Sequence, residues 1–174
     1  FVAKKEFATA IKAMPTILAR HPNAKLLLIG SALLEQEYHN LIKDAATAAA
    51  IHMPGEVDPA CLKDYYSASD IFLMPSERHP SDGLNVVVVE AMACARPIVA
   101  SSVGGNDLVV FENVNGFLHK AGDADALALA LDPLIVDGAQ RMAMGKKSRQ
   151  LVDERFSWPA IAALLLAKSR HLAA

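Results

Sequence analysis

The sequence predicts an α/β domain in which a doubly wound parallel sheet is covered by helices. Three observations predict it. Short apolar runs recur along the chain, a helix-forming segment follows each of them, and turn residues separate the two kinds of segment. The run at residues 25–29 has no polar alternation, which is typical of a strand buried on both faces.

In the first half, Phe7, Ile11 and Met14 recur at helical spacing and predict a helix that ends near Arg20. Asp58 followed by Pro59 is a typical N-cap and first-turn pair, so a helix is expected to begin there. The elements expected in order are a helix to residue 20, a strand at 25–29, a helix at 33–49, a strand at 51–53 and a helix at 59–67.

The centre of the chain is expected to form one βαβ unit. Residues 71–74 and 97–100 are apolar runs, and the apolar segment 84–95 lies between them. Taken alone, the four valines that begin at Val86 would favour a strand, because β-branched residues are enriched in strands. The residues that follow favour a helix, however, and the spacing leaves room for only one element. We therefore expect a buried helix between two parallel strands.

This unit places two acidic residues at chemically useful positions. Asp82 and Gly83 would lie at the carboxyl end of a parallel strand, just before a helix N-terminus, where ligands of open α/β sheets bind and phosphate is favoured. Glu90 would lie within an apolar helix, and an unpaired polar group there costs about 2–7 kcal/mol. A ligand's hydroxyl pair, a backbone amide or a lysine could each satisfy it.

The rest of the chain reads as a short helix, a turn, a last strand and three helices. These are expected at 107–111, 113–116, 117–119, 124–136, 139–154 and 159–172. Phe156, Trp158 and the leucines at 164–166 would supply apolar anchors. We expect a single domain over residues 1–174, with residues 156–174 as its C-terminal helix.

Composition excludes several classes of function. The net charge of −2 gives no electrostatic case for nucleic-acid binding. The two cysteines predict buried thiols in a reducing, cytoplasmic compartment. No apolar run approaches the ~18 residues of a membrane span. The six histidines lack metal-ligand spacing, and no Gly-rich dinucleotide, Walker or nucleophile-elbow motif occurs. The chain starts at Phe1 without a methionine, so we expect a fragment of a longer protein.

Several blocks of sequence occur in an order and at a spacing that match a known family. They read HPNAKLLLIG, ASDIFLMPS, EAMACARPIVASSVGG, NVNGFLHKAGDADALALAL and RFSW. The chain resembles the C-terminal, donor-binding domain of retaining glycosyltransferases of the two-domain B-type fold, closest to glycosyltransferase family 4. The resemblance covers nearly the whole chain and implies a Rossmann-like sheet.

The resemblance implies roles for individual residues. The family has two acidic residues separated by seven, and Asp82 and Glu90 match them, although Asp82 is one methylene shorter than the usual glutamate. It implies that Asp82 is the catalytic residue beside the donor sugar and that Glu90 holds the ribose hydroxyls. The remaining residues implied in donor binding are the diphosphate lysine Lys5, the loop residues Gly83, Leu84, Asn85 and Val86, and, as further possibilities, Gly30 and Val57.

The implied activity is transfer of a hexose from a UDP- or GDP-sugar, with retention and without a metal or other cofactor. The acceptor would be a glycan, a lipid or a small molecule, and it would bind an N-terminal domain outside this chain, where any peripheral membrane contact would also lie. A first strand of the sheet and an arginine would be outside the chain as well. We expect the isolated domain to bind nucleotide but to transfer nothing.

Two other functions remain open. One is a non-catalytic sugar-nucleotide-binding module, favoured by the shorter Asp82 and by a shortened loop at Asn106. The other is an epimerase of the same fold acting on a sugar nucleotide.

Overall fold

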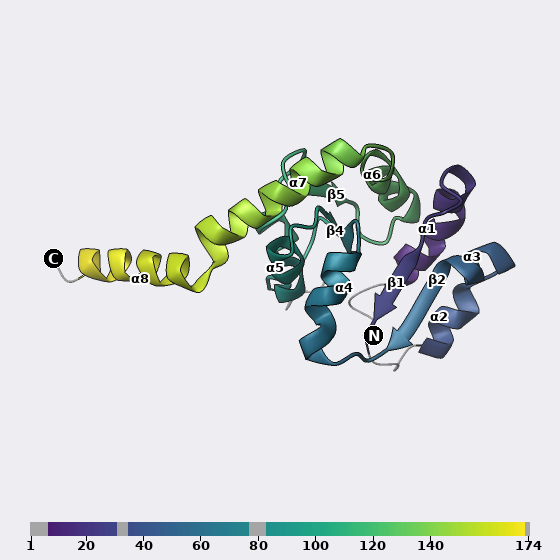
Figure 1. Cartoon of the computed structure of the whole chain (residues 1–174), viewed down its shortest axis with the longest axis horizontal. Helices are drawn as coiled ribbons and strands as arrows, with labels where there is room; N and C mark the ends of the chain where they lie inside the picture. Colours follow the sequence, from purple (N-terminus) through teal and green to yellow (C-terminus); the bar gives the residue numbers. More distant parts are fainter. Residues whose placement is uncertain (1–6, 31–34, 77–82, 173–174) are drawn as a thin grey trace.

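The computed structural model describes residues 7–30, 35–76 and 83–172, and within them the strands form two parallel sheets. In the first sheet β1 (Leu26–Ile29) pairs with β2 (Ile51–Gly55). In the second, β4 (Ile98–Ser101) lies between β3 (Phe72–Met74) and β5 (Gly116–His119). The expected parallel strands are confirmed. Among the described residues the two sheets are separate, because none pairs β1 with β3 (Figure 1).

Helices cover both faces of the three-stranded sheet, as in a doubly wound fold. Val99 of β4 packs with α1 (Phe7–Arg20) and α6 (Ala124–Val136) on one face. Its neighbours Ile98 and Ala100 pack with α5 (Val86–Ala93) on the other. All three side chains are fully buried, which explains why this strand is apolar without alternation.

The four valines at the start of α5 are helical, as the sequence predicts, and Val88 is fully buried. The prediction of one helix at 33–49 is wrong in one respect, because this segment forms two helices, α2 (Glu35–Leu41) and α3 (Ala45–Ala50). Asp44 separates them because its carboxylate accepts hydrogen bonds from the N–H and Oγ1 of Thr47, both at 2.8 Å. An aspartate that caps a new helix in this way ends the preceding one.

A short 3-10 turn, Pro59–Cys61, leads into α4 (Leu62–Ala68), and Asp58 caps the turn by accepting from the N–H of Ala60 at 2.9 Å. The N-cap prediction is therefore confirmed. Cys61 is exposed, contrary to the expectation of buried thiols.

The C-terminal part is helical, with one irregular turn. The helix α7 (Gly138–Leu151) runs into a π-helical turn, Val152–Phe156, and α8 (Trp158–Leu172) follows. In Figure 1, α8 projects away from the body of the domain. Its expected apolar anchors are consequently exposed, and Trp158 retains 84% of its accessible surface.

Candidate functional site

Two loops at the carboxyl edge of the three-stranded sheet lie against each other. One leads from β3 into α5, and the other follows β4. Gly105 has φ +72°, and a Cβ atom on it would lie 3.2 Å from the main-chain nitrogen of Leu84 and 3.4 Å from the carbonyl carbon of Gly83. The loops therefore touch backbone to backbone, and a side chain at position 105 would push them apart.

A chain of buried polar groups fixes the start of α5. The Asn85 amide donates to Asn106 Oδ1 at 3.1 Å, and the Asn106 amide donates to the carbonyl of Ser101 at 2.9 Å. Ser101 Oγ in turn donates to the carbonyl of Ser76 at 2.6 Å. All four residues are buried, so the network ties the loops after β3 and β4 together in a low-dielectric setting.

The network explains the short loop at Asn106. That residue is fully buried and joins Asn85 to the end of β4, so its position after the glycine pair has a structural role. The side chain of Asn85 points inward to Asn106 and makes no cap hydrogen bond.

The N-terminus of α5 faces outward. Val86, its first residue, keeps 65% of its surface, and Gly83 and Leu84 are also exposed. The N–H groups of a helix's first turn have no acceptor within the helix, and the helix dipole adds a positive potential there. Such a terminus is suited to a phosphate or another anion.

Glu90 is not enclosed by apolar side chains, contrary to the expectation from the sequence. Its side chain is exposed, and Oε2 accepts a hydrogen bond from Oη of Tyr66 at 2.9 Å. Burial, together with this hydrogen bond and the negative charge of Glu90, raises the pKa of the Tyr66 phenol well above its usual range. The phenol therefore stays protonated and remains a donor to Glu90.

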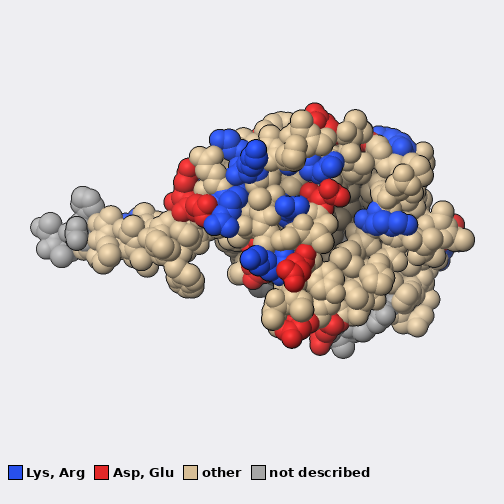
Figure 2. Space-filling view, viewed as in Figure 1, with Lys and Arg blue, Asp and Glu red and all other residues tan. Residues whose placement is uncertain are grey.

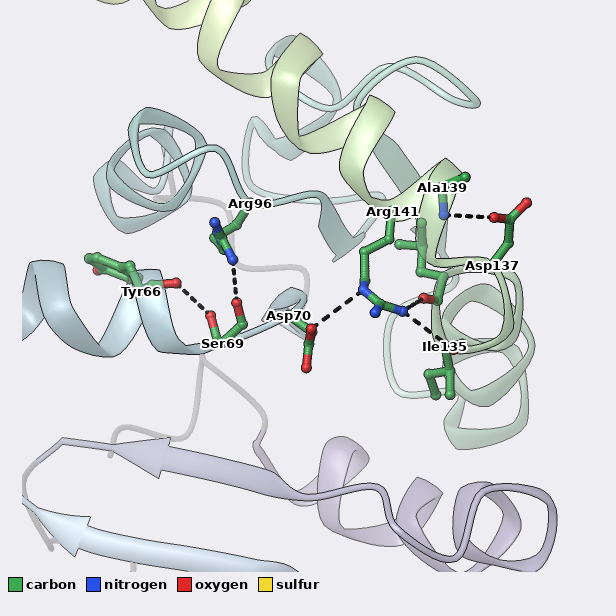
Figure 3. A network of polar contacts seen from close by, with 9 residues as sticks. Tyr66, Ser69, Asp70, Arg96, Ile135, Asp137, Ala139 and Arg141 are labelled. Carbon is green, nitrogen blue, oxygen red and sulfur yellow. Dashed lines mark hydrogen bonds and ion pairs between the residues drawn. The ribbon is translucent and has the colours of Figure 1, made fainter.

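Tyr66 is held in place by its own surroundings. Its ring meets that of Phe72 edge-on, with centroids 5.7 Å apart. Ser69 Oγ donates to the carbonyl of Tyr66 at 2.9 Å, and Arg96 Nη1 donates to the carbonyl of Ser69 at 2.7 Å (Figure 3). Nothing in the spacing of residues 66 and 90 indicates that their side chains meet.

Of the other predicted site residues, the structure describes Gly30 and Val57. Gly30 directly follows β1 and donates its N–H to the carbonyl of Gly55, the last residue of β2, at 3.0 Å. Val57 follows β2 and is half-buried. Both lie at the carboxyl edge of the two-stranded sheet. Lys5 and Asp82 lie outside the described residues.

Two buried polar atoms have no partner among the described residues, Ser76 Oγ and His119 Nε2. They belong to the segments that end β3 and β5, at the same edge of the sheet as Asn106. Burial lowers the pKa of His119, while the carbonyl of Lys120 and the charge of Asp123 act in the opposite direction. The sequence gives no signal for either residue.

Within the described ranges, no cluster of three His, Cys, Asp or Glu side chains could hold a metal ion. Within the same residues, none of the helices is long and apolar enough to cross a membrane. On the face shown in Figure 2, acidic and basic side chains are interspersed.

Residues 1–151 match the sequence profile of the family described as glycosyl transferases group 1. The chain belongs to this family. It is 32% identical over 161 residues to the GDP-mannose-dependent monoacylated alpha-(1-6)-phosphatidylinositol monomannoside mannosyltransferase of Corynebacterium glutamicum. That match covers 90% of this chain and 42% of the relative.

Solved structures of similar proteins share the fold. Sucrose-phosphate synthase from Thermosynechococcus elongatus is 31% identical, with a TM-score of 0.76 over 98% of this chain and 43% of its own. Anabaena HepE in complex with UDP has a TM-score of 0.83 at 23% identity, over 98% of this chain and 46% of its own. The C-terminal domain of a Francisella tularensis group 1 glycosyl transferase, LpcC, has a TM-score of 0.81 at 23% identity, over 91% and 83%.

These matches define which part of the family's architecture the chain represents. The chain spans less than half the length of the curated relatives it matches. Its extent instead corresponds to a C-terminal domain solved separately. The α/β fold and the membership of the glycosyl transferases group 1 family agree with the resemblance seen in the sequence.

Proposed function

We propose that this chain is the donor-binding domain of a retaining hexosyltransferase and that the donor lies at the N-terminus of α5. The observation that carries the proposal is the fixed position of that terminus. Its loop rests backbone to backbone on Gly105, and the buried amides of Asn85 and Asn106 hold it. A preorganised helix end exposes first-turn N–H groups to an anion at no cost in rearrangement.

In this proposal the diphosphate of the donor is bound by the main-chain N–H groups of the loop from Gly83 to Val86. Transfer of the hexose leaves negative charge on the departing nucleoside diphosphate, and N–H groups aimed at that charge stabilise the transition state. Lys5 would add a positive charge, and Asp82 would act beside the sugar. Leu84 and Asn85 contribute main-chain groups, since the side chain of Asn85 is already bonded to Asn106.

Glu90 holds the ribose of the nucleotide in this arrangement. It lies on α5, the same helix whose N-terminus binds the diphosphate, so one rigid element sets the distance between the two contacts. Tyr66 occupies Oε2 of Glu90, and the remaining oxygen is available to accept from a ribose hydroxyl. Gly30 and Val57 would approach the ligand from the edge of the two-stranded sheet.

The acceptor, a glycan, lipid or small molecule, would bind a second domain, and the reaction would take place between the two domains. The C. glutamicum relative is named as a mannosyltransferase dependent on GDP-mannose, and HepE was solved with UDP. A UDP- or GDP-hexose is therefore the donor class to test first. This assignment places the protein in the cytoplasm, where nucleotide sugars would be supplied, with any peripheral membrane contact made by the second domain.

Calorimetric titration with UDP, GDP, UDP-glucose and GDP-mannose tests the proposal. We expect one nucleotide and its sugar to bind to the isolated chain without hexose transfer. Glu90→Ala should weaken binding by about 1–3 kcal/mol, the cost of leaving a hydrogen-bond partner unsatisfied. Glu154→Ala is the control, because that exposed glutamate bonds only to Gln150 among the described residues. Equal affinity in the two variants would contradict the role of Glu90, and transfer by the isolated chain would contradict the need for a second domain.

A further inference from the structure

The end of β5 lies beside the end of β4, which leads into one of the two loops of the candidate donor site (Figure 1). Ser101 and His119 are the last residues of these strands and are partners in the parallel register. The N–H of Ser102 donates to the carbonyl of His119 at 2.9 Å. Because Ser101 belongs to the buried polar network that fixes the start of α5, His119 is a direct neighbour of that network.

The imidazole ring of His119 has a hydrogen-bond partner at only one of its nitrogens among the described residues. Nδ1 lies 2.9 Å from the carbonyl oxygen of Lys120, and a carbonyl oxygen only accepts, so Nδ1 carries a proton. In the neutral ring Nε2 is then an acceptor, and none of the described residues donates to it. The residue retains 5% of its accessible surface, so a second proton on the ring would be a charge in a buried position.

The groups that pack against the end of β5 do little to stabilise such a charge. On one side β4 carries no charged residue, and on the other side lies the N-terminus of α6. Asp123 favours the protonated ring, but its carboxylate caps α6 and accepts from the N–H of Ala126 at 2.9 Å. The positive potential of the helix N-terminus opposes a further cation. Lys120 and Asp125, the other charged residues there, are exposed.

A proton on Nε2 therefore costs less when the end of β5 is open to water than when it is packed. A histidine exposed to water has a pKa of about 6.5. Burial lowers the pKa of His119 in the packed state. As the pH falls through this range, the ratio of open to packed chains rises, by at most about tenfold per pH unit for one proton. Local openings of this kind need less free energy than global unfolding does.

Opening of this strand end would act on the donor site through Ser101. The carbonyl of Ser101 accepts from the side-chain amide of Asn106, and its Oγ donates to the carbonyl of Ser76. Asn106 Oδ1 in turn accepts from the amide of Asn85, the residue that precedes α5. Release of Ser101 would therefore release the start of α5. A binding site that must first be ordered binds its ligand less tightly than a preorganised one.

We propose that neutral His119 is a pH-sensitive support of the donor site, and that protonation of its ring opens the ends of β4 and β5 and lowers the affinity for a sugar nucleotide. The effect on affinity rests on the proposed function, whereas the opening of the strand ends does not. Because linkage is reciprocal, a bound sugar nucleotide must oppose protonation of His119 by the same factor. The response falls just below neutral pH, where imidazoles titrate.

Amide hydrogen exchange in the chain without ligand tests the opening. The protection factor of the Ser102 amide corrects the observed rate for the intrinsic pH dependence of exchange. It should fall from about pH 7.5 to about pH 5.5, by no more than about tenfold per pH unit. The amide of Phe72 is the control, because it donates to the carbonyl of Pro97 at the opposite edge of the same sheet and should keep its protection. Constant protection at Ser102, or an equal fall at Phe72, would overturn the proposal.

Calorimetric titration with UDP-glucose and GDP-mannose at the same two pH values tests the effect on affinity. Sugar nucleotides are used because the terminal phosphate of a nucleoside diphosphate itself titrates near about pH 6. For the sugar nucleotide that binds, the affinity of the parent chain should fall by about threefold to tenfold on acidification, within the limit for one proton. The affinity of His52→Gln, at an exposed position in β2, should fall equally, and that of His119→Gln should stay constant.

The outcomes separate this inference from the proposed function. An equal fall in affinity in the parent chain and in His119→Gln would overturn the role of His119. An affinity of the parent chain that does not change with pH would overturn it as well. Binding of neither sugar nucleotide at the higher pH would contradict the proposed donor site, and the exchange of the Ser102 amide would then decide whether protonation opens the strand ends.

Discussion

Tyr66 Oη donates a hydrogen bond to Glu90 Oε2 at 2.9 Å, which joins α4 to α5 directly beside the candidate donor site. Among the described residues no other group bonds the carboxylate, so its second oxygen can accept from a ligand, and the contact with Tyr66 fixes the direction in which it points. Tyr66 is thus a positioning residue for Glu90.

The variant Tyr66→Phe tests this relationship. It keeps the ring that packs on Phe72 and removes only the donor. Nucleotide affinity should fall by about twofold to twelvefold, which corresponds to the ~0.5–1.5 kcal/mol of one net hydrogen bond. Tyr65→Phe is the matched control, since Tyr65 is half-buried in the same helix. The two variants are compared by calorimetry, and an equal loss of affinity in both would contradict the positioning role.

Two glycines near α5 should respond differently to alanine. A Cβ on Gly83 would meet no atom of the described residues within 4 Å, and the backbone there is not left-handed, so Gly83→Ala should leave stability unchanged or raise it by ~0.4–1 kcal/mol. It should still weaken nucleotide binding, because the methyl group would stand where the ligand approaches the loop. Full affinity in Gly83→Ala would indicate that no ligand comes close to this residue.

Gly105→Ala is the contrasting variant. Its φ of +72° and its contact with Leu84 make alanine strained at that position. The free energy of unfolding should fall by about 1–2 kcal/mol. Urea unfolding measures this loss, and a Gly105→Ala protein as stable as the parent chain would contradict the close packing of the two loops.

His119 predicts a pH dependence of stability. It retains 5% of its surface, its Nε2 has no partner among the described residues, and burial lowers its pKa from 6.5. Because the pKa of His119 is lower in the folded chain, the unfolded chain takes up the proton at a higher pH than the folded chain does. The stability contributed by neutral His119 is therefore complete above about pH 6.5 and is lost as the pH falls below it. The slope for this one proton cannot exceed about 1.4 kcal/mol per pH unit.

Urea unfolding of the parent chain and of His119→Gln between about pH 8 and pH 5.5 measures this effect. As the pH is lowered, the stability of His119→Gln should fall less than that of the parent chain. The stability of His52→Gln, a variant at an exposed position in β2, should fall as much as that of the parent chain. Identical pH profiles for the parent and His119→Gln would show that protonation of His119 does not limit stability.

The sequence predicts most of the fold because its elements are marked locally. The cap at Asp58 and the unbroken apolar runs need no tertiary information. The valine run of α5 could be assigned to a helix only by the spacing of its neighbours. The break at Asp44 was missed because the flanking alanines and the preceding helix formers favour one helix, and a single side-chain cap decides otherwise.

The main-chain part of the candidate site can be predicted from the sequence, whereas its side-chain contacts cannot. Its main-chain elements follow from the order of strands and helices, which places Gly83 and Asn106 at one edge of the sheet. The contacts between side chains do not follow from it. Tyr66 meets Glu90 across 24 residues of sequence, and Asn85 meets Asn106 across 21, through the packing of elements that carry no mark of the pairing. The separation of β1 from β3 is likewise a property of the assembled sheet.

Mapping bound nucleotide on the isolated chain by NMR tests most directly whether the donor lies at the N-terminus of α5. The nucleotide is the one that binds in the calorimetric titrations, and the measurement follows the change in each main-chain amide resonance as it is added. We expect the largest changes at Gly83, Leu84 and Val86, with smaller changes at Gly105 and Glu90. Changes confined to β1 and β3, with the start of α5 unaffected, would contradict this position of the donor.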